Sequence, residues 1–485
     1  LNPILFINKI DKRDQRAMEV VDMVYELFME LEANDEQLDF PILYGIAKQG
    51  IAKFELEDEG KDLTPLFDTI ISHVKPYPNF DEEPLQFQIS ALGYDDYIGR
   101  LGIGRIYKGK VSRGQIVTLC KEDGSFVQRK IGQIFVYRGL KRTPVNSAGS
   151  GDIVVISGIP DISIGETVCE NQKPLPMEMI KIEEPTMSMN FIVNNSPFAG
   201  KEGKFVTSRQ IRARLYKELE TDVSLRVEDT ASTDSFRVSG RGELHLSVLI
   251  ENMRREGYEF QVSKPEVLYK KDKNGKLLEP IEIVTIDVDQ EFVGSVIEKL
   301  GQRKADLVNM NPSQAGYTRL IFNIPARGLI GYRSEFLTDT RGSGTLNTEF
   351  KGYEPFKGEI PKRNVGSLIC FETGVATAYG LNSAQERGIL FISPQAEVYE
   401  GMVVGSNAKG LDIEVNVCKK KQQTNIRSSA SDDALKLSPP KIMSLEEMLE
   451  FIESDEYIEV TPKSLRMRKK ILDSQLRYKS KKNSK

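Results

Sequence analysis

The apolar residues of the first 76 positions follow two alternating patterns. Residues 3–7 form a continuous apolar run of the kind found in buried parallel strands, and residues 40–44 form a second one. Between these runs, six apolar residues recur at the spacing of one helix face: Val20, Val21, Val24, Leu27, Phe28 and Leu31. A strand, a helix and a strand in this order predict part of an α/β domain over residues 1–76. The prolines within residues 76–78 mark its end.

From residue 85 the hydrophobic period shortens to two. Leu85, Phe87 and Ile89 alternate with polar residues, which is the pattern of a half-buried strand. Short strand-like runs follow to about residue 169, and glycine-containing turns separate them. Closely spaced strands without a helical pattern predict a small β-barrel over residues 77–175.

The next two segments repeat one order of elements, β-α-β-β-α-β. In residues 185–265 the pattern predicts strands at 187–193, 223–227, 234–238 and 258–262, with helices at 205–219 and 242–253. In residues 276–352 it predicts strands at 281–288, 305–310, 316–324 and 345–350, with helices at 292–301 and 329–338. Two ferredoxin-like split-βαβ modules in tandem are therefore expected.

Residues 354–485 are predicted to form a further unit. Short β runs occur at 367–371 and 389–393, and an amphipathic helix follows at 444–452. Ser444 is placed as the N-cap of that helix, with Glu447 at the capping-box position. The fold class predicted for the whole chain is thus multidomain: an α/β unit, a β-barrel, and α+β modules.

Composition narrows the chemistry. The 485 residues carry a net charge of −5, and no apolar run approaches the roughly 18 residues that span a membrane. The four cysteines lie far apart without a CxxC pair, which suits a reducing cytoplasm and argues against a disulfide scaffold or a zinc site. With only His73 and His245, a histidine metal centre or a Ser/His/Asp triad is nearly excluded, and no metal ligands are predicted.

The first apolar run ends in a motif that can recognise guanine. Asn8, Lys9 and Asp11 form NKxD directly after the predicted strand. The Asp carboxylate can accept two charge-assisted hydrogen bonds from the N1–H and N2 edge of guanine, which adenine lacks. The Asn amide would brace the loop, the Lys stem would cover a ring face, and the backbone N–H of Ala47 would meet the base carbonyl. The alternative is an ordinary polar turn between a strand and a helix.

Phosphate-binding elements are not found in the sequence. Five Gly-Lys pairs occur, but none is followed by Ser or Thr, so none stands in a GxxxxGK[ST] motif. Asp96 and Gly99 match DxxG, yet they follow NKxD instead of preceding it, so this motif is interpreted as a turn. We therefore expect an N-terminally truncated chain without catalytic residues, which alone neither hydrolyses GTP nor binds it tightly.

Two basic segments near the C-terminus are candidates for RNA binding. The first combines cations with amides: Lys419, Lys420, Lys421, Gln422, Gln423, Thr424, Asn425 and Arg427. The second lies in residues 462–485, where ten basic residues face the single acid Asp473. Its proposed phosphate contacts are Lys463, Arg466, Arg468, Lys469 and Lys470. The alternatives are a solvated loop and a solubilising chain end.

Several longer runs resemble one protein family. The run VSGRGELHL at residues 238–246 is similar to the third domain of elongation factor G. ARGLIGYR at 326–333, TRGSG at 340–344, AQERG at 384–388 and KQQTNIR at 421–427 together resemble TypA/BipA. The chain is identified as a member of this family of ribosome-binding translational GTPases, and the resemblance extends over its whole length.

The resemblance implies a cytoplasmic, monomeric protein that binds GTP or GDP with Mg²⁺ and hydrolyses GTP to GDP and phosphate. Residues 1–76 would be the C-terminal remnant of the GTP-binding domain. The split-βαβ modules would correspond to domains III and V of elongation factor G, and residues 354–485 to the family's RNA-binding C-terminal domain. Expected partners are both ribosomal subunits with their rRNA and the tRNA acceptor end, in large-subunit biogenesis and stress-dependent translation.

Other basic residues allow two interpretations. Arg241, Arg327, Arg333 and Arg341 are placed either in solvent or against rRNA. His245 is expected to pack rather than to catalyse, because Val248, Leu249 and Met253 share its helical segment. For the whole chain, a non-enzymatic ribosome- or tRNA-binding module and an unrelated structural protein with chance motifs remain the alternatives to a GTPase.

Overall fold

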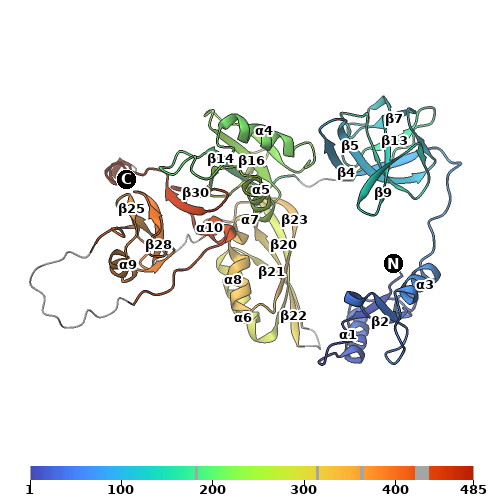
Figure 1. Cartoon of the computed structure of the whole chain (residues 1–485), viewed down its shortest axis with the longest axis horizontal. Helices are drawn as coiled ribbons and strands as arrows, with labels where there is room; N and C mark the ends of the chain where they lie inside the picture. The colour runs from blue at the N-terminus through green and yellow to red at the C-terminus, as the bar shows by residue number, and fades with distance from the viewer. Residues whose placement is uncertain (1, 181–183, 313–315, 361–364, 421–435, 484–485) are drawn as a thin grey trace, which may run out of the picture.

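The computed structural model describes residues 2–180, 184–312, 316–360, 365–420 and 436–483. Figure 1 shows the chain passing from an N-terminal α/β unit through an extended connection to a β-barrel, and then to the modules that hold the C-terminus. No helix in the described ranges is long and apolar enough to span a membrane.

The N-terminal unit is a three-stranded sheet covered by helices. Its elements are β1 (Leu5–Asn8), α1 (Ala17–Glu30), α2 (Asp35–Leu38), β2 (Ile42–Ile46), η1 (Ala47–Gln49), β3 (Ile51–Lys53) and α3 (Thr64–His73). β1 and β2 are parallel, as the two apolar runs predict, and β3 pairs antiparallel with β2. The core is small: Ile7, Ala17, Val21 and Tyr44 are buried, whereas Met18 and Ile71 are mostly exposed. This unit therefore leaves apolar helix surface uncovered.

The barrel unit consists of strands without a helix among the described residues 77–180. Its strands are β4 (Gln86–Asp95), β5 (Gly99–Lys108), β6 (Val111–Ser112), β7 (Ile116–Cys120), β8 (Phe126–Lys130), β9 (Ile134–Arg138), β10 (Lys141–Val145), β11 (Ser147–Ala148), β12 (Ile153–Ile156) and β13 (Thr167–Glu170). Eight of them form one antiparallel sheet in the order β10-β9-β12-β5-β4-β13-β7-β8, and β6 pairs with β11. The alternating residues Leu85, Phe87 and Ile89 point into its core.

The first split-βαβ module has the predicted element order. It contains β14 (Met187–Val193), α4 (Ser208–Glu218), β15 (Arg226–Asp229), β16 (Ser235–Gly240), α5 (Glu243–Arg255) and β17 (Phe260–Ser263), with sheet order β15-β16-β14-β17. Thr207 and Gln210 form a reciprocal capping box at the start of α4. The short strands β18 (Glu266–Val267) and β19 (Lys270–Lys271) lead to the second module.

The second module repeats this topology with different side chains. It contains β20 (Leu277–Asp289), η2 (Gln290–Phe292), α6 (Val293–Gln302), β21 (Asp306–Pro312), β22 (Tyr317–Pro325), α7 (Ala326–Leu329), α8 (Tyr332–Asp339) and β23 (Thr345–Pro355). Its sheet runs β21-β22-β20, with β23 on the other side of β20. The internal repeat predicted from the sequence is therefore present in the structure.

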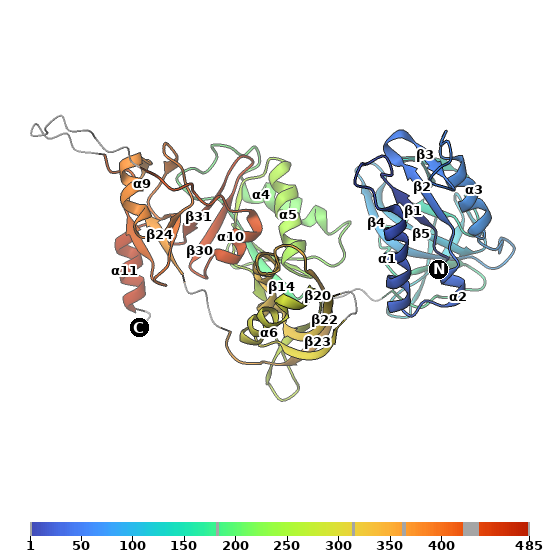
Figure 2. The same ribbon diagram turned by 90° about the horizontal axis from the view of Figure 1, so that it is seen from below.

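The C-terminal elements extend the sheet of the first module. They are β24 (Gly366–Cys370), β25 (Gly374–Val375), α9 (Ala378–Gln385), β26 (Ile389–Leu390), β27 (Glu397–Val398), β28 (Met402–Asn407), β29 (Ile413–Val415), α10 (Leu445–Phe451), β30 (Glu456–Val460), β31 (Leu465–Lys469) and α11 (Ser474–Asn483). β17 pairs with β30, so one sheet continues as β15-β16-β14-β17-β30-β31-β28-β24-β29. Figure 2 shows β30 and β31 between the first module and α9.

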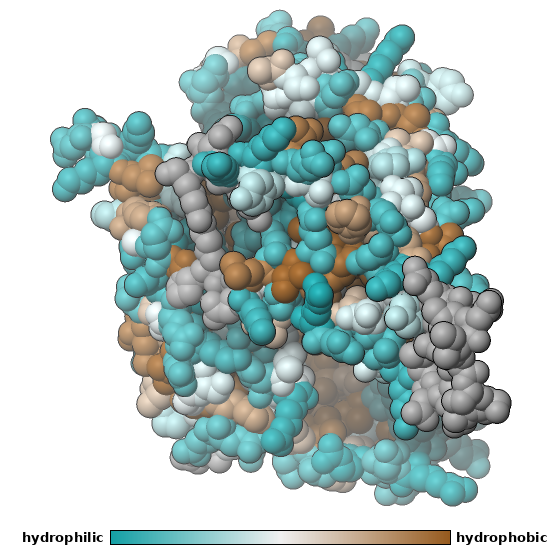
Figure 3. Space-filling view, turned by 90° about the vertical axis from the view of Figure 1, so that its left-hand side faces the viewer, coloured by the Kyte–Doolittle hydropathy of each residue, from teal (hydrophilic) through white to brown (hydrophobic). Residues whose placement is uncertain are grey.

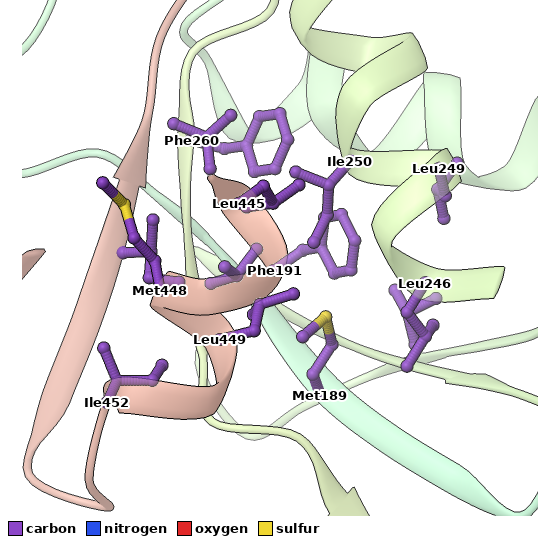
Figure 4. Packing of buried hydrophobic residues seen from close by; sticks show 14 of the residues in the cluster. Met189, Phe191, Leu246, Leu249, Ile250, Phe260, Leu445, Met448, Leu449 and Ile452 are labelled. Carbon is purple, nitrogen blue, oxygen red and sulfur yellow. The ribbon is translucent and has the colours of Figure 1, made fainter. Parts of the chain in front are cut away.

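α10 completes the hydrophobic core of the first module. Ser444 and Glu447 form the predicted capping box at its start. Leu445, Met448 and Leu449 are buried in one cluster with residues of α5 and β14, and Figure 4 shows them packed against Phe191 and Ile250. The sequence predicted residues 354–485 as a unit of their own. In the structure these elements have a core cluster of their own around Tyr399, and they also share one sheet and part of a core with the first module, about 200 residues earlier.

Candidate guanine-binding loop and RNA-binding surface

The NKxD motif and the Ala47 loop meet at one edge of the N-terminal sheet. Because β1 and β2 are parallel and in register, Asn8 lies opposite Gly45 and both strands end at the same side. The Asn8 Oδ1 accepts hydrogen bonds from the N–H of Lys9 at 2.8 Å and from the N–H of Ala47 at 2.9 Å. Lys9 has the positive φ of 66° that brings its N–H back to Asn8. Asn8 therefore braces both loops, as the motif predicts.

The same geometry corrects one prediction. The backbone N–H of Ala47 was expected to meet a base carbonyl, but in the structure it bonds to the Asn8 side chain. Ala47 thus contributes by holding Asn8 in place. The side chains of Lys9 and Asp11 are exposed beside this bridge, where a planar base can reach them.

The DxxG match is a turn, as predicted. Asp96 and Gly99 lie in the hairpin between β4 and β5, and Gly99 has the positive φ of 76° that such turns require. Tyr97 at its tip is 98% exposed. Asp95 accepts hydrogen bonds from the N–H groups of Tyr97 and Ile98, which fixes the turn.

The first basic segment is only partly described. Lys419 and Lys420 are exposed just after β29. The other predicted RNA contacts of this segment lie outside the described residues: Lys421, Gln422, Gln423, Thr424, Asn425 and Arg427. Figure 3 faces the end of the molecule that carries β25, β28 and α9, and its surface is mainly hydrophilic.

The second basic segment requires a correction, because three of its five cations are turned inward. The Lys469 side chain is 2% exposed and its Nζ lies 2.8 Å from Asp412 and 2.9 Å from the fully buried Glu456. Burial alone would lower the pKa of Lys469, but the charge of Glu456 reverses the effect and raises it. A phosphate cannot reach this ammonium group.

Arg466 and Arg468 also lie at the joint between the first module and the C-terminal elements, where β30 and β31 continue the sheet from β17. Arg466 donates to Glu202 at 2.7 Å and approaches the fully buried Glu459 at 3.4 Å. Arg468 is buried and donates to Gln261 at 2.5 Å. These arginines therefore connect β31 to the first module instead of presenting charge to RNA. Lys463 and Lys470 remain exposed, so only these two of the five predicted contacts are accessible.

The four other arginines predicted to dock on rRNA differ in burial: Arg327 is largely buried, and the other three are exposed. Arg327 donates to Glu279 at 2.5 and 3.2 Å, and its guanidinium lies 4.5 Å from the centre of the Phe356 ring. Because Glu279 is fully buried, Arg327 serves as its counter-ion, and the prediction that it docks on rRNA is corrected. Arg241, Arg333 and Arg341 are exposed.

His245 has a structural role, as its helical context predicts. Its Nδ1 accepts the N–H of Arg241 at 3.3 Å, and its Nε2 lies 2.5 Å from Asp222. Burial would raise the pKa of Asp222, but hydrogen bonds from His245 and Ser224 lower it to about 2. The imidazole therefore links the start of α5 to the loop before β15.

A neighbouring carboxyl group lies where three elements meet. Glu243 begins α5, and it accepts a hydrogen bond from the backbone of Gly331. Burial, with the nearby charges of Glu450 and Glu446, raises the pKa of Glu243 to about 7. Among the described residues, no three His, Cys, Asp or Glu side chains are grouped as metal ligands.

A further pair of residues beside the first basic segment was not predicted from the sequence. Thr377 and Gln385, at the two ends of α9, bond to the backbone on either side of residues 421–435. Gln385 belongs to the AQERG run that served only as a family marker. A threonine before a short helix is an N-cap signal, but its second partner could not be predicted.

Four family models match the chain in succession. They are elongation factor Tu domain 2 over residues 99–169, elongation factor G domain III over 206–264, the elongation factor G C-terminus over 276–364, and the TypA/BipA C-terminal domain over 365–474. Their order agrees with the succession of barrel, two modules and C-terminal elements in the structure.

Curated relatives match along nearly the whole chain. A protein named large ribosomal subunit assembly factor BipA from Bacillus subtilis is 51% identical over 100% of this chain and 79% of its own length. Proteins of the same name from Synechocystis and from Escherichia coli K12 are 48% and 50% identical, each over 97% of this chain and 78% of their own length. A solved structure from Thermus thermophilus has a TM-score of 0.41 at 18% identity, over 70% of this chain and 67% of that one, which is too low to bear on the fold.

Proposed function

The chain belongs to the TypA/BipA family of translational GTPases, and from this premise we propose that it acts on the ribosome as a large-subunit assembly factor. Relatives with 48–51% identity carry that function in their names. The proposed partners are the rRNA of both subunits and the tRNA acceptor end, with the chain acting as a cytoplasmic monomer. A role in translation under stress belongs to the same proposal.

The NKxD motif and Ala47 are suited to one part of the GTPase cycle, the recognition of guanine. The observation that carries it is the bridge from Asn8 to Ala47, which joins the ends of two parallel strands, with the exposed Lys9 and Asp11 directly after the first of them. Asp11 would accept the N1–H and N2 edge of the base, and the stem of Lys9 would cover its face. Bound Mg²⁺ would supply charge neutralisation at the phosphates.

Hydrolysis requires a phosphate-cradling loop, and no GxxxxGK[ST] occurs in the 485 residues. We therefore expect the polypeptide of this sequence alone to turn over no GTP. The second candidate is a non-enzymatic module that binds ribosomal RNA or tRNA by shape and charge, and the exposed Lys419 and Lys420 favour it. Ribosome-stimulated GTP turnover by the purified 485-residue chain would reject both this expectation and the second candidate.

An Asp11→Asn variant should exchange the base preference of the loop. An amide cannot accept both donors of guanine, but its N–H₂ can donate to the second carbonyl of xanthine. We expect wild type to contact guanosine over xanthosine in saturation-transfer NMR, with the preference reversed in the variant. Loss of a charge-assisted bond pair should weaken guanosine binding by roughly tenfold or more.

The matched control for this experiment is Asp14→Asn, an exposed carboxylate on the same loop. It should retain the wild-type preference. Equal contacts of wild type with guanosine, xanthosine and adenosine would reject guanine recognition by this loop.

RNA binding through Lys419 and Lys420 is the second testable part of the proposal. Each lysine that neutralises a phosphate releases a counterion, so affinity falls with salt in proportion to the number of contacts. The double variant Lys419→Ala/Lys420→Ala should lower the slope of log K against log salt by about one to two on purified large subunits. Co-sedimentation at several salt concentrations measures this slope.

Lys271→Ala/Lys273→Ala removes the same charge from exposed positions near β19 and is the control. It should leave the slope close to the wild-type value. If both double variants shift the slope equally, the effect comes from net charge, and the assignment of Lys419 and Lys420 fails.

A further inference from the structure

Lys419 and Lys436, which are described residues on either side of 421–435, are both bound to one helix. At the start of α9, the Thr377 hydroxyl donates to the carbonyl of Lys419 at 2.5 Å. At its end, the Gln385 amide donates to the carbonyl of Lys436 at 2.9 Å and accepts the N–H of Ser438 at 3.0 Å. Thus the carbonyls of Lys419 and Lys436 are both held at α9, one at its N-cap and the other at its last residue.

The helix itself is firmly seated. Leu381 and Ala384 are buried in the core that also contains Val417. A Cβ at Gly380 would lie 2.3 Å from the carbonyl oxygen of Val417, so the helix is in direct contact with the backbone that follows β29. The N–H of Thr377 also donates to this oxygen at 2.9 Å. The backbone at Val417, which leads to Lys419 and Lys420, is therefore held against α9.

The spacing of the two attachments follows from helix geometry. Thr377 and Gln385 are eight residues apart, which corresponds to about 12 Å along the axis. Lys419 and Lys420 are exposed at one attachment, and Lys436 is exposed at the other. The carbonyls of Lys419 and Lys436 are thereby held at the two ends of one helix, and Lys420 follows Lys419 directly. Among the described residues, no ion pair is formed by the ammonium groups of these three lysines.

We propose that Thr377 and Gln385 are positioning residues that hold these lysines in register with the phosphates of ribosomal RNA. The inference rests on the proposed RNA binding of Lys419 and Lys420. Because the backbone at Lys419 and Lys436 is already fixed in the free protein, less conformational entropy is lost when RNA binds. This favours simultaneous contacts with several phosphates. The partner is an RNA backbone, because the exposed ammonium groups of Lys419, Lys420 and Lys436 match a polyanion.

Stabilising α9 alone would account for only part of the hydrogen bonds that Thr377 and Gln385 form. Thr377 is the N-cap of α9 and accepts the N–H of Gly380, which stabilises the helix start. Its bond to Lys419 is additional to that cap. Gln385 occupies the last helical position, and its bonds to Lys436 and Ser438 bind a different part of the chain. The two roles are separated by measuring RNA contacts as well as stability.

The test uses the full chain, large ribosomal subunits and the slope of log K against log salt. Thr377→Val/Gln385→Met retains every charge but removes both attachments. We expect its slope to fall by about one and its affinity to fall by roughly three- to tenfold at about 100 mM salt. Thr377→Ser should restore the hydroxyl contact and most of the slope, and Gln385→Met alone should have a partial effect.

The matched control is Thr207→Val/Gln210→Met, which removes the N-cap and its partner from α4. It should lower thermal stability but not the slope. An unchanged slope in Thr377→Val/Gln385→Met, with a reduced slope in Lys419→Ala/Lys420→Ala, would overturn the positioning role alone. An unchanged slope in both would overturn the proposed RNA binding itself. If the double variant fails to fold, the folded single variant Gln385→Met decides, since its wild-type slope would contradict the inference.

Discussion

Replacing Lys469 with methionine is expected to lower the stability of the joint between the first module and the C-terminal elements by about 3–5 kcal/mol. Its ammonium group is 2% exposed and lies within 3.0 Å of Asp412, Asp455 and Glu456. Without the cation, these carboxylates repel one another and lose their charge-assisted hydrogen bonds. Calorimetry is the suitable measurement, because a chain of several units does not unfold in one step.

The neighbouring variant Lys463→Met is the control. Lys463 is exposed on the turn between β30 and β31, so its removal should change stability by no more than about 0.5 kcal/mol. RNA affinity separates the two interpretations further: a phosphate-binding Lys469 would give a weaker complex and a smaller salt slope with unchanged thermal stability. That result would contradict the buried geometry.

Arg327→Met should have the second large effect, again about 3–5 kcal/mol. The substitution leaves the fully buried Glu279 without the guanidinium that neutralises it and removes a hydrogen bond to the carbonyl of Gly358. The second split-βαβ module should therefore unfold at a lower temperature. The double variant Arg327→Met/Glu279→Gln should recover part of the loss, since it removes the buried negative charge.

Arg333 provides the comparison for this prediction, because it is exposed in the same ARGLIGYR run. Arg333→Met should be nearly neutral for stability. If Arg327→Met instead left the calorimetric transition unchanged and lowered only rRNA binding, Arg327 would be a surface contact and not the counter-ion of Glu279.

The element pattern of this protein could be predicted from the sequence because the relevant forces are local. Helical and alternating periods predicted both β-α-β-β-α-β units, and the Ser444–Glu447 spacing predicted the start of α10. The approach of Asn8 to Ala47 was also predictable, because parallel strands in register end at the same sheet edge. Each of these inferences needs only neighbouring residues or a general rule of sheet geometry.

Which of the basic side chains are buried and which are exposed could not be predicted in this way. Arg466, Arg468 and Lys469 lie within one short charged run, which on its own resembles a solvated tail. The partners of Arg466 and Arg468 are Glu202 and Gln261, which lie more than 200 residues earlier and are reached only because β30 pairs with β17. Lys469 instead pairs with Asp412, Asp455 and Glu456. Charge composition indicates a candidate contact with phosphate, whereas only long-range strand pairing decides which charges are buried.

The double attachment of α9 escaped prediction for a related reason. Thr377 and Gln385 look unremarkable in the sequence, because their hydrogen bonds go to backbone groups. A backbone partner has no side-chain signature, so no motif records it. The AQERG run indicated a family and nothing about the chain that it holds.

The most direct measurement is the affinity of the purified 485-residue chain for large ribosomal subunits, compared with small subunits and with free duplex RNA at equal phosphate concentration. The proposed function predicts that large subunits bind more tightly than duplex RNA, with an affinity that falls steeply as salt rises from about 50 to 200 mM. Equal affinity for all three, or binding that does not depend on salt, would contradict an RNA-directed role on the large subunit.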